Sequence, residues 1–77
     1  MQFLYNCSEL TSVTIPNNVT TIGNITFLGC EGLTSITFPY SLNYIGDYAF
    51  RICRGLTSIT IPYSVTHIGH RAFCGCI

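Results

Sequence analysis

The chain has 77 residues, of which 48% are hydrophobic and only 8% are charged, and its formal net charge is zero. A chain of this length forms one small domain or a part of a larger one. Nucleic acid is not an expected partner, because there is no basic stripe to neutralise phosphates. No apolar run approaches the roughly 18 residues that a membrane span requires. The stretch MQFLYNCSEL at the start lacks the basic start and long apolar core of a signal peptide, so we expect none in these residues.

The sequence repeats at a constant interval of 23 residues. One phrase occurs three times, as ELTSVTIP at 9–16, GLTSITFP at 32–39 and GLTSITIP at 55–62. Four cysteines fall on the same interval, namely Cys7, Cys30, Cys53 and Cys76. A fixed period of this length is typical of solenoid proteins, in which each repeat packs on the one before it. Residues that occupy equivalent places in successive repeats are called a column below.

Each copy of the phrase predicts a short β-strand, at about residues 10–15, 33–38 and 56–61. Apolar and polar residues alternate at the end of the phrase, as in a strand with one buried face, and Thr and Ile favour strands. The proline that follows cannot donate a hydrogen bond to the next rung and therefore ends the strand. We expect the copies to stack in parallel and in register, with identical residues roughly 4.8 Å apart.

The rest of each repeat is expected to return the chain to the next strand. A recurrent Ile-Gly pair predicts a tight bend, because Gly tolerates a positive φ and close approach. The stretches DYAFRIC, from Asp47, and HRAFCGC, from His70, then predict a short helical or 3₁₀ turn with Phe and Cys pointing inward.

Together these elements predict a single repeat array over residues 1–77. Its full repeats are 7–29, 30–52 and 53–75, with partial repeats at 1–6 and 76–77. Natural arrays close their ends with atypical polar caps, and neither end of this chain has a charged cap. We therefore expect a fragment of a longer array, or a unit that assembles end to end.

The recurring pattern C-x-x-L-T-S-[VI]-T-[IF]-P-x-x-[VL]-x-x-I-G-x-x-[AT]-F resembles the BspA-like leucine-rich repeat of the surface-antigen type, over essentially the whole chain. The resemblance implies a leucine-rich-repeat solenoid with a parallel sheet on its concave side. It implies a location on the cell surface or outside the cell, and a role in adhesion and binding to proteins of a host or a neighbouring cell. The family provides no catalytic residues, so we expect no enzyme activity, and no cofactor is expected.

The cysteine column has two interpretations. Cysteines can bind metal or form disulfides, but Cys is also a small residue that is often buried. Identical side-chain conformations would hold neighbouring sulfurs nearly one strand spacing apart, and a linear column cannot surround a tetrahedral zinc ion. We therefore expect thiols with a structural role.

The stretch HIGHRAFCGC contains His67, His70, Cys74 and Cys76, whose residue types resemble a set of zinc ligands. His67 and His70, however, occupy columns that vary freely and are expected on the outside. Cys76 belongs to the inward cysteine column. We therefore expect no metal site, and the redox state of Cys74 stays open.

Columns that vary between repeats are the best candidates for recognition, whereas the constant Ser and Thr columns are expected to be scaffold. The candidate binding surface consists of Tyr40, Tyr63, Tyr44, Tyr48, His67 and Arg71. Tyr is a common anchor at interfaces, and Tyr40 and Tyr63 are expected to stack one rung apart.

Two functions remain open on the sequence alone. The first is a non-enzymatic protein-binding and adhesion module, with a host or neighbouring-cell protein as its partner. The second is a self-stacking spacer or filament unit, whose partners are other copies of itself. A third and more distant hypothesis is that the hydroxyls of the constant Ser and Thr columns bind glycans or ice.

Overall fold

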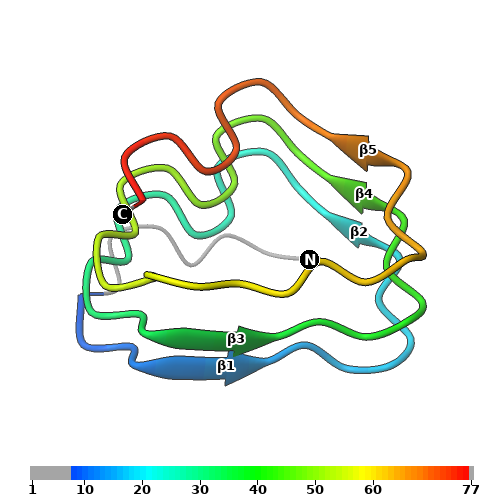
Figure 1. Ribbon diagram of the computed structural model, residues 1–77, viewed down its shortest axis with the longest axis horizontal. Coiled ribbons are helices and arrows are strands. Elements are labelled where there is room, and N and C mark those ends of the chain that lie inside the picture. Colours follow the sequence, from blue (N-terminus) through cyan, green and yellow to red (C-terminus); the bar gives the residue numbers. More distant parts are fainter. Residues whose placement is uncertain (1–7, 77) are drawn as a thin grey trace.

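The computed structural model describes residues 8–76. The strands within that range are β1 (Ser12–Thr14), β2 (Thr21–Ile22), β3 (Ser35–Thr37), β4 (Tyr44–Ile45) and β5 (His67–Ile68). β1 and β3 form one sheet, and β2, β4 and β5 form another. Figure 1 shows the chain winding in successive coils around a common interior, with the two sheets on different sides of each coil.

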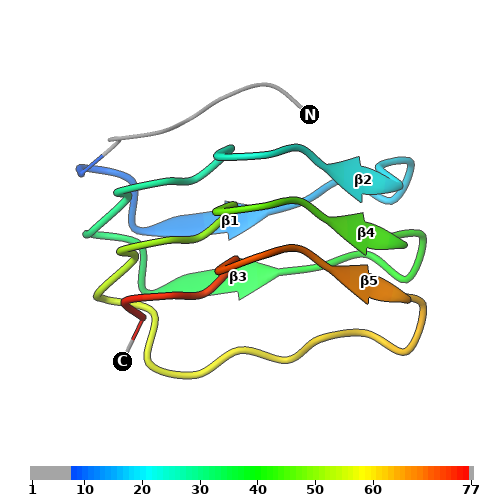
Figure 2. The same cartoon turned by 90° about the horizontal axis from the view of Figure 1, so that it is seen from above.

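Every strand pair is parallel and joins residues of one column. Val13 of β1 lies opposite Ile36 of β3, and Tyr44 of β4 lies between Thr21 of β2 and His67 of β5. Figure 2 shows the strands of each sheet side by side along the stack. The prediction of short parallel strands in register is thus confirmed for the first two copies of the phrase.

The third copy of the phrase forms no strand, so the strand predicted over 56–61 is wrong. Figure 2 shows this segment, coloured yellow, running farther from β3 than β3 runs from β1. The segment has the same alternation of apolar and polar residues as the other copies. It lacks the hydrogen-bonded neighbour that a strand requires.

The second sheet was not predicted, because the Ile-Gly pair was interpreted as a tight bend. Ile22 and its column instead lie in the two-residue strands of this sheet. The N–H of Gly46 donates to the carbonyl of Ile22 at 2.8 Å, which continues the ladder past the strand. A Cβ on Gly46 would lie 2.5 Å from Oδ1 of Asn24. Glycine is therefore needed here for close approach of two coils, as expected, and not for a positive φ.

The return path consists of consecutive turns, and residues 8–76 contain no helix, so the expected helical or 3₁₀ turn is not confirmed. A typical turn is closed by the N–H of Leu28, which donates to the carbonyl of Ile25 at 3.2 Å. Ile25, Tyr48 and Arg71 form one column, and their φ angles are 55°, 57° and 53°. A left-handed residue interrupts a right-handed helix after a single turn. Residues 8–76 therefore contain no helix that is long and apolar enough to cross a membrane.

Columns of similar side chains fill the interior. The rings of Phe27 and Phe50 stack with their centroids 5.0 Å apart and an interplanar angle of 9°, and those of Phe50 and Phe73 stack at 5.2 Å and 0°. Leu33 and Leu56 are buried beside them. Burying one such side chain stabilises a fold by about 1.5–3 kcal/mol, so these columns are the main source of stability. The predicted inward-facing phenylalanines are confirmed.

Candidate functional site

The cysteine column lies in the interior. Its members within the described residues are Cys30, Cys53 and Cys76, and Cys7 lies outside them. The thiol of Cys53 donates a hydrogen bond to the carbonyl of Phe27 at 3.1 Å, and the thiol of Cys76 donates to that of Phe50 at 3.1 Å. Burial, followed by the neighbouring Cys76, raises the pKa of Cys53 to about 12, and burial also raises the pKa of Cys76. Both thiols are therefore protonated at neutral pH and act as structural hydrogen-bond donors.

The four residues that resemble a zinc set are not gathered around one point. Among residues 8–76 no group of three or more His, Cys, Asp or Glu side chains is placed to hold a metal ion. The two histidines each contact a different tyrosine ring, as set out below. Cys74 is exposed, whereas the thiol of Cys76 points inward to a backbone carbonyl.

Two of the six candidate surface residues form a stacked pair. Tyr44 of β4 and His67 of β5 are opposite each other in the second sheet, and their rings are parallel within 2° with centroids 4.8 Å apart. Ile45, the next residue along β4, is buried, so Tyr44 points away from the interior. The parallel register of the sheet therefore builds a two-ring platform on its outer face.

Tyr48 is the centre of a second group, in the turn that follows β4. The guanidinium carbon of Arg51 lies 5.5 Å from the centroid of the Tyr48 ring, and the ring of His70 meets Tyr48 edge to face at 5.8 Å and 87°. Nε of Arg51 is buried and has no hydrogen-bond partner. Such a cation–π contact is worth about 0.5–1 kcal/mol at an exposed site. Arg71 is exposed in the Tyr48 column.

Arg51 lies outside the predicted surface, and the sequence pattern indicates His70 only as a metal ligand. The spacing of three residues between Tyr48 and Arg51, within one turn, is the signal that would have identified the contact. The column of His70 is also not freely variable. Oδ1 of Asn24 accepts the N–H of Asp47 at 2.8 Å, and Oδ1 of Asp47 accepts the N–H of His70 at 2.8 Å. Asn and Asp each have a side-chain oxygen that accepts a backbone N–H of the next coil. This column is therefore part of the structural scaffold.

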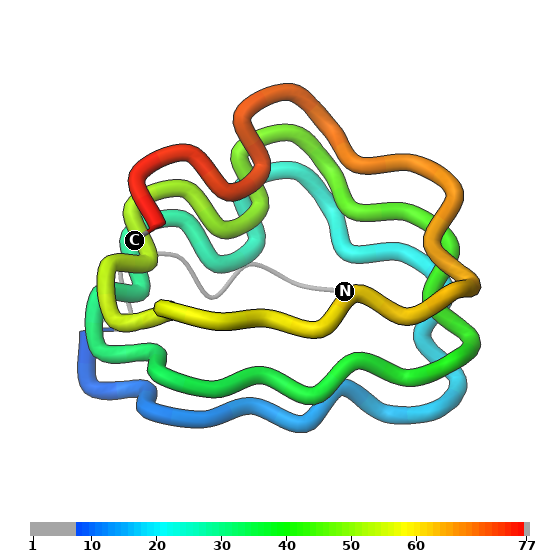
Figure 3. The backbone as a smooth tube through the Cα atoms, in the orientation of Figure 1, coloured from blue at the N-terminus to red at the C-terminus, as the bar shows by residue number. Residues whose placement is uncertain are grey.

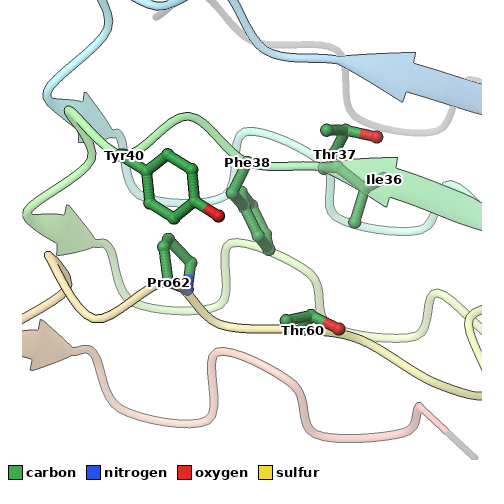
Figure 4. A pocket seen from close by; sticks show the side chains of 6 residues that line it. All are labelled: Ile36, Thr37, Phe38, Tyr40, Thr60 and Pro62. Carbon is green, nitrogen blue, oxygen red and sulfur yellow. The ribbon is translucent and has the colours of Figure 1, made fainter.

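The last two candidates, Tyr40 and Tyr63, are 82% and 101% exposed. Their expected stack is wrong, because no ring contact joins them, although both lie in the described range. Tyr63 follows the third copy of the phrase, which does not pair with β3. Tyr40 instead lies beside Pro62 (Figure 4).

A cavity of about 360 Å³ lies between the second and third coils at this place. Its lining residues are Ile36, Thr37, Phe38, Tyr40, Thr60 and Pro62. This cavity was not predicted, because the third copy of the phrase has nearly the same residues as the first two.

This frame of short parallel strands, stacked at the leucine-rich phrase, defines the protein as a leucine-rich repeat protein. The BspA type leucine rich repeat region, with 6 copies, matches residues 1–77, and the chain belongs to this family. A similar solved structure is the crystal structure of a leucine rich cell surface protein from Faecalibacterium prausnitzii A2-165. It is 43% identical, with a TM-score of 0.87 over 91% of this chain, which spans 18% of that protein. A search of curated proteins gave no match.

Proposed function

We propose that the chain is a non-enzymatic protein-binding and adhesion module, forming part of a solenoid that is displayed on the cell surface or outside the cell. The observation that carries the proposal is the set of tyrosines that the fold leaves on the surface, led by Tyr40 and Tyr63 at 82% and 101% exposure. Membership of the BspA type family and the likeness to a leucine rich cell surface protein support the location. The partner is a protein of a host or a neighbouring cell.

Tyrosine suits this role, because its large rigid body loses little conformational freedom on binding and its hydroxyl makes hydrogen bonds. Tyr44 is held by the parallel ring of His67, and Tyr48 is held by Arg51 and His70. These contacts fix the rings before a partner arrives, which lowers the cost of binding. The chain has no formal net charge, so we expect affinity to depend on packing more than on salt.

The experiment is a biolayer-interferometry screen of the chain against purified cell-surface and extracellular-matrix proteins. Each hit is tested with Tyr40→Ala/Tyr63→Ala and with Tyr44→Ala/His67→Ala. We expect at least one pair to weaken binding about tenfold or more, which is about 1.4 kcal/mol. Ser12→Ala/Ser35→Ala is the matched control, because these exposed residues lie in one column of the first sheet. Wild-type affinity in both tyrosine variants would refute the proposal.

A second function is favoured by one observation in the second sheet. β5 has a hydrogen-bonded neighbour, β4, on one side only of the three-stranded sheet. The N–H and C=O groups of a strand edge can pair with a further strand, which can come from the same array or from another copy. A self-stacking spacer or filament unit would use this edge to bind further copies of itself.

A further inference from the structure

At the leucine-rich phrase, the second and third coils lack the hydrogen bonds that join the first and second coils. The N–H and the Oγ1 of Thr34 both donate to the carbonyl of Thr11, at 2.9 and 3.0 Å. One repeat further on, Thr57 makes neither bond to Thr34. Both segments are described by the structure, and no backbone hydrogen bond joins residues 34–38 to residues 57–61. Figure 3 shows the yellow segment separated from the green coil that precedes it.

A buried serine is independent evidence for this separation. Oγ of Ser41 donates to the carbonyl of Val19, in the preceding coil, at 2.7 Å. Ser64 occupies the same column, yet its Oγ is buried and has no hydrogen-bond partner. A buried hydroxyl without a partner costs free energy. The backbone groups between these segments and the hydroxyl of Ser64 therefore both lack the hydrogen bond to the neighbouring coil that their equivalents make one repeat earlier.

The gap between the second and third coils is bounded at both ends by contacts between the coils. At one end, a Cβ on Gly55 would lie 2.9 Å from the carbonyl oxygen of Leu33, so the two coils are in contact there. At the other end, the N–H of Thr66 donates to the carbonyl of Asn43 at 2.9 Å. The cavity of about 360 Å³ is thus a bounded slit in the side of the coil, which we call the inter-coil slit. Ligand pockets commonly have volumes of about 300–1,000 Å³.

The lining of the inter-coil slit indicates what it binds. None of its six side chains is charged. Figure 4 shows Phe38 projecting between the two segments, with the rings of Tyr40 and Pro62 beside each other at one end. The edge of β3 that faces the slit lacks partners for its backbone groups. An extended peptide satisfies such an edge with its own backbone, and its side chains pack on apolar and aromatic groups.

We propose that the inter-coil slit binds an extended, uncharged segment of a partner protein, which adds as a strand to the free edge of β3. This inference rests on the proposed function, and it narrows the class of partner and the place where it binds. Tyr40 then has two roles, as an exposed anchor and as one end of the slit. A phosphate or an acidic peptide is disfavoured, because the lining has no cation to receive it.

The probe for the experiment is the acetylated and amidated peptide LTSITFP, which copies residues 33–39 and carries no charge. Hydrogen exchange is measured first on the free protein. We expect the amides of Phe38 and Thr57 to exchange at least about tenfold faster than that of Thr34, because only the last is hydrogen-bonded to a neighbouring coil. The peptide should slow exchange at Phe38. The control peptide LPSIPFP, which has lost two N–H donors, should bind at least about tenfold more weakly.

Cross-linking then tests the location in a Cys74→Ser background. In Thr37→Cys/Thr60→Cys, a short bifunctional thiol reagent ties the two sides of the slit together. In the control, Ser12→Cys/Ser35→Cys, the same reagent ties β1 to β3 through a pair that is in register and does not line the slit, and it leaves the slit open. We expect the first bridge to weaken peptide binding at least about tenfold and the second to leave it unchanged.

Two results would overturn the proposal. In one, Phe38 and Thr57 exchange as slowly as Thr34 in the free protein, which means that the coils are joined in solution. In the other, the peptide fails to bind, or binds equally after the Thr37–Thr60 bridge is made. If that bridge leaves binding of a full partner protein intact while Tyr44→Ala/His67→Ala abolishes it, the slit proposal fails and the adhesion proposal stands.

Discussion

Phe50 provides the sharpest test of how the repeats stabilise one another. Its ring is fully buried and is stacked between Phe27 and Phe73, with Phe38 edge-on at 5.8 Å. Replacing a buried Phe by Ala costs about 3–5 kcal/mol, and each aromatic pair contributes about 0.5–1.5 kcal/mol beyond its buried area. Because three ring contacts are lost, we expect Phe50→Ala to cost about 5 kcal/mol. A domain of this length is stable by only about 4–12 kcal/mol, at roughly 0.05–0.15 kcal/mol per residue.

The assay is equilibrium unfolding in urea, followed by circular dichroism. Phe73→Ala is the matched control, because Phe73 lies in the same column but is only half-buried and stacks on Phe50 alone. We expect the control to cost about half as much as Phe50→Ala, or about 2–3 kcal/mol. Equal losses in the two variants, or a loss below about 2 kcal/mol for Phe50→Ala, would show that the stacked column is not the main source of stability.

Three further predictions concern single positions. Asp47→Ala should lower the free energy of unfolding in urea by about 1–2 kcal/mol, because it removes the acceptor for the N–H of His70, whereas Asp47→Asn should change it little. Gly46→Ala should cost more than about 2 kcal/mol in the same assay, since the new Cβ would lie 2.6 Å from the backbone nitrogen of Asn24; a near-neutral result would refute the close approach. The pKa of Cys53 rises from 9.0 to about 12 on folding, so the folded state holds this proton more tightly. The stability that this pKa difference adds to the folded state should be fully present below pH 9 and lost as the pH rises toward 12. In Cys53→Ala, the free energy of unfolding should fall less over the same pH range.

The columns were predictable because their physical cause is local and repeated. A residue such as Phe27 recurs after each interval of 23 residues, and parallel stacking then brings like onto like. The second sheet was not predictable from alternation, because its strands contain two residues each. A two-residue strand has no period to read. The only sequence feature that indicated the second sheet was the glycine of the Ile-Gly pair. That glycine indicates close approach of the coils, but not the hydrogen bonds between them.

The candidate site was predictable only where the register holds. Tyr44 and His67, both in the predicted surface, are one repeat interval of 23 residues apart, and the second sheet brings their rings together. Tyr40 and Tyr63 were assigned to one column by the same reasoning, but the third copy of the phrase departs from β3. Nothing in the residues of that copy distinguishes it from the other two, since the separation depends on long-range hydrogen bonding. The inter-coil slit therefore became visible only in three dimensions.

The most direct test of the adhesion role is sedimentation velocity of the 77-residue chain under reducing conditions, over a wide concentration range. We expect one compact monomer at every concentration, together with a single larger species when a partner from the binding screen is added. Growth into rods as the concentration rises, without any partner, would contradict the adhesion role and would favour the self-stacking unit.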